Sequence, residues 1–94
     1  MTESWRYITS KNLKSFGETD YEKRTITINK NRHNNKKALK KYPEKDRSII
    51  NTIVHEVAHK DHPNMNERNV RKLARKKVAS MSRNQKTKLY NKFK

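Results

Sequence analysis

The sequence contains no cysteine and very little glycine or proline, with one Gly and two Pro in 94 residues. The absence of cysteine excludes disulfide bonds and thiolate metal sites, so any bound metal must take His, carboxylate or water as ligands. Apolar residues make up only 30% of the chain and form no run long enough for a signal peptide or a membrane span. We therefore expect a soluble, intracellular and by default cytoplasmic protein.

Acidic residues are also scarce, and their distribution is uneven. Nine acidic residues against 25 basic ones give a net charge of +16. Residues 64–94 carry eleven basic residues and one acidic residue, whereas residues 49–63 carry one basic and two acidic. Nucleic acid, an anionic membrane surface and acidic protein are natural partners for a protein of such positive charge. The alternative is a compositional drift toward Lys, Asn and Ile with no binding role.

The apolar residues are few but periodic, which predicts one small folded domain over residues 1–94 rather than disorder. Ile26 and Ile28 alternate with Thr25 and Thr27, the period-2 pattern of a half-buried strand. We expect an α+β fold with a small antiparallel sheet over about residues 4–29, built from strands at 4–9, 13–19 and 24–29.

Three helices are expected after a basic loop at residues 30–43. The first runs over about residues 45–61, and Pro63 opposes its continuation. Asn66 is a good N-cap for a second helix, and Ser82 with Gln85 forms a capping-box signature for a third. Together these two basic helices cover about residues 66–93.

A His-Glu-x-x-His motif lies on the first predicted helix. Its residues are His55, Glu56 and His59. Side chains four positions apart share one helix face, so two imidazoles can hold one zinc ion, and Glu56 can act as general base on a zinc-bound water. The alternative is two exposed histidines on a solvated face, with Glu56 an ordinary surface residue.

The run from Thr52 to His59 resembles the active helix of the zincin superfamily of metallopeptidases, in particular its minimal SprT-like and Wss1-like types. The segment from Thr25 to Asn29 is similar to the strand that precedes this helix and borders the substrate cleft. The resemblance implies a twisted sheet, two zinc-binding histidines, a catalytic glutamate and a third ligand on a following helix or turn. Wss1-like proteins carry that third ligand as a histidine at the position that is Met65 here.

Another residue must therefore complete the ligand set. Glu67 is the first choice, because it opens the second helix on its apolar side and would give a two-His, one-Glu zinc site. The alternative role for Glu67 is a first-turn acid favoured by the helix dipole. His62 is the alternative third ligand, Asp61 is weaker, and His33 is expected to be exposed in its basic loop.

The expected activity is zinc-dependent peptide-bond hydrolysis with Glu56 as base. A substrate strand is expected to pair along Ile26 to Asn29. Candidates for the donor that stabilises the oxyanion are Tyr42, Tyr90 and His62, which the sequence does not rank.

A basic face on the second predicted helix is a candidate nucleic-acid-binding surface. Its residues are Arg68, Arg71, Lys72, Arg75 and Lys76, with Lys36, Lys37, Lys40 and Lys41 nearby. Tyr90 and Phe93 could stack on bases, although their helical spacing favours core packing. The competing functions are therefore a metallopeptidase held near nucleic acid, and a non-catalytic nucleic-acid-binding or regulatory protein on a zincin scaffold.

Overall fold

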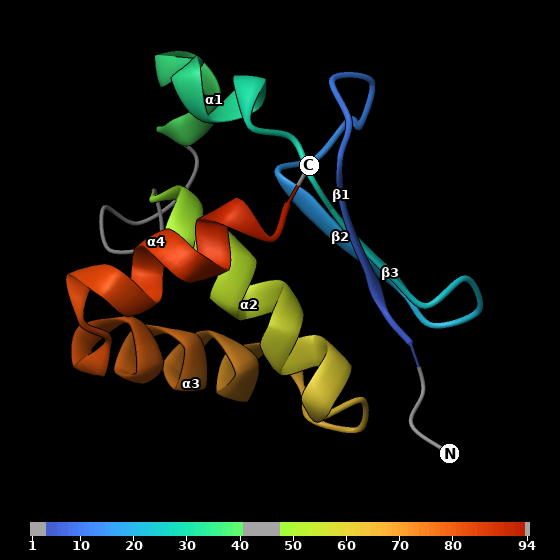
Figure 1. Cartoon of the computed structure of the whole chain (residues 1–94), viewed down its shortest axis with the longest axis vertical. Coiled ribbons are helices and arrows are strands. Elements are labelled where there is room, and N and C mark those ends of the chain that lie inside the picture. Colours follow the sequence, from blue (N-terminus) through green and yellow to red (C-terminus); the bar gives the residue numbers. More distant parts are fainter. Residues whose placement is uncertain (1–3, 41–47, 94) are drawn as a thin grey trace.

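The computed structural model describes residues 4–40 and 48–93. A small sheet comes first in the chain and helices follow it, which confirms the predicted α+β class (Figure 1). The elements in chain order are β1 (Arg6–Thr9), β2 (Gly17–Asp20), β3 (Thr25–Ile28), the 3-10 helix η1 (Asn31–Asn34), α1 (Lys36–Leu39), α2 (Ile49–Asp61), α3 (Glu67–Ser80) and α4 (Arg83–Asn91).

The sheet is mixed, and the prediction of a wholly antiparallel sheet is wrong. Its strand order is β1-β3-β2, with β1 parallel to β3 and β2 antiparallel to β3. A tight turn joins β2 to β3, in which the Asp20 side chain accepts hydrogen bonds from the backbone N–H groups of Glu22 and Lys23. The chain reverses twice between β1 and β3, so β3 inserts beside β1 in the same direction.

The strand order also overturns the expected position of a substrate strand. β3 is the central strand and pairs with a neighbour on each side, so its backbone has no free edge along Ile26 to Asn29. β2 is an edge strand of this sheet, and it packs against α2.

The core lies between the sheet and α2. Ile26 and Ile28 are fully buried against Ile53 of α2 and against Phe93, which follows α4. α2 is the central helix, because it contacts the sheet, α3 and α4 (Figure 1). Phe93 is only 2% exposed and stacks edge-to-face on Tyr7, so it belongs to the core and not to a base-stacking surface.

Side-chain caps fix where the helices begin. α2 begins at Ile49, later than the predicted start near residue 45, because Ser48 has an extended backbone and its hydroxyl accepts from the N–H of Asn51. The predicted Asn66 cap and the Ser82–Gln85 capping box are both confirmed. In the described part of the chain, no helix is long and apolar enough to cross a membrane.

Candidate metal and catalytic site

α2 carries the His-Glu-x-x-His motif on the side of the helix opposite its buried apolar side chains. Ile53, Val54 and Ala58 are buried, whereas His55 and His59 are partly exposed. The two imidazoles meet edge to face one helical turn apart, with 3.1 Å between their Nε2 atoms. The sequence pattern therefore gives the expected local arrangement of these two side chains.

The side chain of Glu67, the first residue of α3, approaches the imidazoles of His55 and His59. The turn after His62 reverses the chain, and α3 packs back along α2. The Glu67 carboxylate lies 2.8 Å from His55 Nε2 and 3.0 Å from His59 Nε2. Among the described residues, these three side chains form a group able to hold a metal ion, with ligand atoms within 4.8 Å of one another.

The three contacts cannot all be hydrogen bonds at once. Each Nε2 atom carries at most one hydrogen, and an ionised carboxylate carries none. At most two hydrogens are therefore available for three mutual contacts of 2.8 to 3.1 Å. A cation among these atoms would accept a lone pair from each of them, so the donor set fits a metal ion better than it fits a closed hydrogen-bond network.

Glu56 lies beside this group in a cleft. The cleft has a volume of about 180 Å³, and His55 and Glu67 also line it. The hydroxyl of Thr19 on β2 lies 2.7 Å from Glu56 Oε1 and 3.0 Å from the Glu56 backbone oxygen. Because a hydroxyl donates one hydrogen at a time, Thr19 ties the glutamate to the edge strand through one of two alternative hydrogen bonds.

Gly17 allows the edge strand to come this close. A Cβ atom at this position would lie 3.0 Å from a methyl carbon of Thr52 and 3.1 Å from Cγ of Glu56. It would also lie 3.0 Å from Cδ1 of Ile28. Such distances are tighter than ordinary packing, so the single glycine of the chain stands where β2 crosses the motif face of α2.

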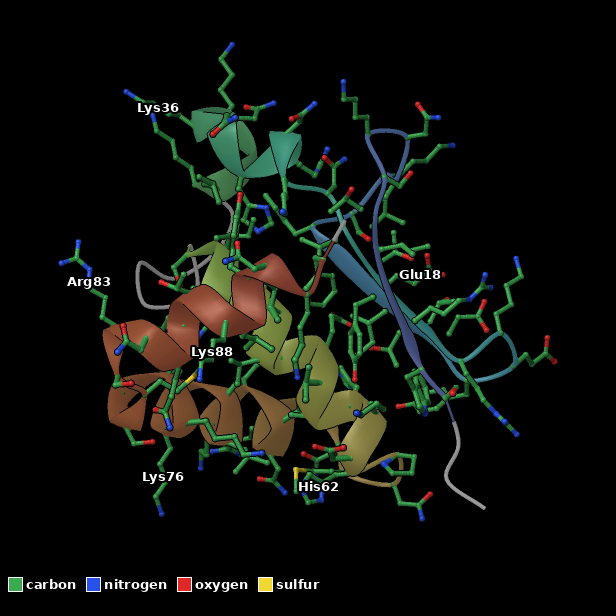
Figure 2. All side chains as sticks on the ribbon, viewed as in Figure 1. Glu18, Lys36, His62, Lys76, Arg83 and Lys88 are labelled. Atoms are coloured by element: carbon green, nitrogen blue, oxygen red, sulfur yellow. The ribbon has the colours of Figure 1, made fainter. Side chains whose placement is uncertain are left out.

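His62 lies apart from the ligand group. It is the C-cap residue of α2 and is exposed at the end of that helix (Figure 2). Asp61 is half-exposed and its carboxylate lies 3.7 Å from Lys60 Nζ. The structure therefore brings Glu67, the first choice, to the two histidines and leaves both alternatives outside the group.

The prediction that His33 is exposed in a basic loop is wrong. Its Nδ1 lies 2.8 Å from the backbone oxygen of Asn29, and its Nε2 lies 2.9 Å from the Thr52 hydroxyl. The Phe16 ring packs edge-on against the imidazole. Burial lowers the pKa of His33 from its usual 6.5, more than its hydrogen bond to Asn29 raises it.

Neither Tyr90 nor His62, the two described candidates for an oxyanion donor, lines the cleft. Tyr90 lies on α4 under the ammonium of Lys30, and Tyr42 lies outside the described residues. Tyr21, which the sequence did not single out, donates a 2.6 Å hydrogen bond to the backbone oxygen of His59. Desolvation and the nearby Glu56 carboxylate both raise the pKa of Tyr21.

The predicted basic face divides into two parts. Arg68, Lys72 and Lys76 are exposed along successive turns of α3. Arg71 instead lines the cleft, with its Nε 3.6 Å from Glu67 Oε1. Arg75 is only partly exposed. The sequence analysis missed Gly17 and Thr19, which lie beside Glu56, and Tyr21, which contacts the backbone of His59, because their positions depend on how β2 and the turn after it pack on α2.

Comparison of the chain with protein-family models, curated proteins and solved structures found no match.

Proposed function

We propose that this protein is a small zinc-dependent peptide hydrolase of zincin type, in which His55, His59 and Glu67 hold the metal and Glu56 is the general base. One observation carries the proposal. Three metal-ligating side chains from two helices converge within 4.8 Å, and the motif glutamate lines the cleft beside them. The resemblance of Thr52 to His59 to zincin active helices supports the same assignment.

The choice of zinc rests on the donor set. Zinc favours tetrahedral sites with imidazole nitrogen and carboxylate oxygen ligands, and bonds of about 2.0 to 2.1 Å put its ligand atoms about 3.3 Å apart. The two Nε2 atoms are 3.1 Å apart, Glu67 Oε1 lies 2.8 Å from His55 Nε2, and Glu67 Oε2 lies 3.0 Å from His59 Nε2. With one ligand atom taken from each residue, the three atoms lie within 4.8 Å of one another, so small side-chain rotations would bring them to this spacing. A bound zinc ion would supply Lewis-acid polarisation of the peptide carbonyl and would make water more acidic.

Glu56 handles the proton in the proposed reaction. Its carboxylate takes a proton from the attacking water and passes it to the leaving nitrogen of the peptide. The Thr19 hydroxyl, 2.7 Å from Oε1, holds the carboxylate in position while lone pairs remain for that proton. Thr19 thereby couples the base to the strand that forms one wall of the cleft.

We assign the substrate-pairing role to β2 instead of β3. The backbone N–H of Asn29 donates to the oxygen of Phe16, so the antiparallel ladder turns the backbone groups of Gly17 and Thr19 toward the outer edge. No other strand pairs with that edge among the described residues. An extended peptide added there would run past Glu56 by strand addition.

The test compares wild type with Glu56→Gln, using a disordered protein as substrate. Wild type should contain about one equivalent of zinc and cleave the substrate, and a chelator should stop cleavage. Glu56→Gln should keep zinc and the unfolding midpoint but lose about 100- to 10,000-fold in rate, the usual contribution of a general base. Cleavage products are quantified by mass spectrometry.

Matched variants separate the metal from the base. His55→Ala and His59→Ala should lose zinc, measured by elemental analysis of protein purified without added metal or chelator. Full zinc occupancy in the double variant would contradict the ligand assignment. Zinc-loaded wild type that cleaves nothing, with or without DNA, would contradict the enzymatic proposal.

A second candidate function is sequence-independent nucleic-acid binding, which leaves room for a non-catalytic binding or regulatory role. The favouring observation is the exposed row of Arg68, Lys72 and Lys76 on α3, a helix whose only acidic residue, Glu67, is in its first turn. Lys76 projects outward from this helix in Figure 2. The salt dependence of binding distinguishes this function from peptide hydrolysis.

A further inference from the structure

The cleft extends from the metal group along the His55 side, where its walls differ in character. Phe16 and Leu39 provide apolar surface, and Asn51 and Thr52 provide polar groups. Its volume is about 180 Å³. Because a cavity of roughly 150 Å³ holds a benzene-sized molecule, this cleft has room for about one medium-sized side chain.

Arg71 is the cationic side chain that lines this cleft among the described residues. It follows Glu67 by four positions, so the geometry of α3 places the two side chains on one face. The Arg71 Nε lies 3.6 Å from Glu67 Oε1, and the arginine side chain is 47% exposed. A guanidinium has five N–H donors, so this contact leaves capacity for a second carboxylate.

The charges around the cleft make an acidic ligand favourable. Among the described residues that line the cleft, Glu56, Glu67 and Arg71 are the acidic and basic ones. When Glu67 is used as a metal ligand, a divalent cation more than neutralises it, and the positive charge of Arg71 is left for another anion. The net charge of +16 adds a long-range field that attracts acidic chains.

We propose that this cleft is a specificity pocket for an acidic side chain, which selects peptides with Asp or Glu beside the scissile bond through pairing with Arg71. This inference rests on the proposed function, because it takes the metal group as the place where the peptide bond lies. Phe16 and Leu39 contact the methylene groups of the substrate side chain, and Arg71 binds its carboxylate. The substrate class is therefore acidic peptide segments.

The experiment measures binding separately from cleavage. Zinc-loaded Glu56→Gln protein is titrated with two labelled alanine-rich peptides that differ only in one central residue, Glu or Gln. The Glu peptide should bind about tenfold more tightly, as a charge-assisted contact with arginine predicts. Adding Arg71→Gln should remove the difference, and Arg71→Glu should favour a matched Lys peptide instead.

Arg83→Gln is the matched control. Arg83 is an exposed arginine at the start of α4 that projects away from the fold, so its loss changes the net charge without touching the cleft (Figure 2). The preference for the Glu peptide should persist in this variant. The zinc affinity of Arg71→Gln should equal that of its parent.

Several results would overturn the pocket. These are equal binding of the two peptides, no binding of either, a preference that survives Arg71→Gln, and an equal loss in Arg83→Gln. A fall in zinc affinity in Arg71→Gln would instead make Arg71 a positioning residue for Glu67.

Cleavage by the chain with native Glu56 separates the two proposals. An Arg71-dependent preference without cleavage of any peptide would leave the pocket standing and remove the hydrolase. Cleavage of the Glu and Gln peptides at equal rates would support the hydrolase and remove the pocket.

Discussion

At the scale of single residues, the site depends on a carboxylate that no local motif identifies. Glu67 lies twelve positions after His55, yet its oxygen is 2.8 Å from the imidazole. The helix-dipole role and the ligand role both place an acid at the first turn of α3. The contact of Glu67 with both histidines favours the ligand role, and a mutational test of zinc affinity separates the two roles.

Glu67→Ala should weaken zinc binding by more than about 100-fold, beyond the 10- to 100-fold cost typical of residues that only support a ligand. Glu67→Gln keeps the shape but loses the charged oxygen, so it should also lose zinc affinity while keeping α3 stable. Affinities are measured by competition with a zinc indicator. His62→Ala is the control, and a larger loss there than in Glu67→Ala would reverse the assignment.

His33 predicts a pH dependence of stability. Because burial lowers its pKa from 6.5, the unfolded chain binds a proton at this residue more readily than the folded protein. The stability that neutral His33 contributes is complete above pH 6.5 and is lost as the pH falls from 6.5 toward the lower folded-state pKa.

The measurement is the free energy of unfolding in urea at pH 7.5 and at pH 5.5. Wild type should lose more stability over this interval than His33→Gln, since all other titrating groups are common to both proteins. Equal losses in the two proteins would show that His33 does not titrate across this range.

At the scale of elements, α4 contributes to the core by positioning Phe93, which follows it. The Ser82–Gln85 capping box begins the helix, and the helix carries Phe93 back to the sheet beside Ile26 and Ile28. A small domain has few such buried side chains, so each one supports a large share of its stability.

Phe93→Ala should therefore cost about 3 to 5 kcal/mol in the free energy of unfolding, the usual range for a buried aromatic. Lys88→Ala, at an exposed position on the same helix, should change stability by less than about 0.5 kcal/mol. Denaturant unfolding measures both. A small loss in Phe93→Ala would mean that the chain end contributes little to the core.

In the sheet, the alternation of apolar and polar residues predicts a strand but does not predict which strands pair. Alternation of Ile26 and Ile28 with threonines predicts a strand, and β3 is confirmed there. Periodicity says nothing about which strands are neighbours, because every strand with one apolar face satisfies the same rule. The central position of β3, and with it the edge position of β2, follows from how the strands pair.

At the scale of the whole molecule, the net charge of +16 predicts salt-sensitive binding to nucleic acid. Triple reversal of Arg68, Lys72 and Lys76 to glutamate should weaken binding equally for all sequences. It should also reduce the slope of log affinity against log salt by about 0.9 for each phosphate contact that is lost. Fluorescence anisotropy with duplexes of unrelated sequence provides the measurement.

A matched reversal on the sheet side tests whether position or net charge matters. Lys11, Lys14 and Lys23 are exposed in the strand connections, and changing them to glutamate alters the net charge by the same amount. This variant should retain most of the slope of log affinity for nucleic acid against log salt concentration. Equal losses of nucleic-acid affinity in the two triple variants would indicate that the net charge matters and its position does not. Undetectable binding of wild type at low salt would favour compositional drift as the origin of the charge.

The sequence by itself determined the features that depend on near neighbours along the chain. These are the caps at Asn66 and Ser82, the helical placement of His55 and His59 on one face, and the absence of thiolate chemistry. Each follows from fixed backbone geometry over a few residues, so spacing alone is sufficient.

Only the tertiary structure decided how distant segments meet at the site. Packing of β2 on α2 brings Thr19 to Glu56, and the single glycine makes room for that approach. Packing of α3 on α2 brings Glu67 to the histidines and turns Arg71 into the cleft, away from the exposed basic row. These contacts depend on which faces pack together, and many arrangements of the same elements satisfy the local pattern equally well.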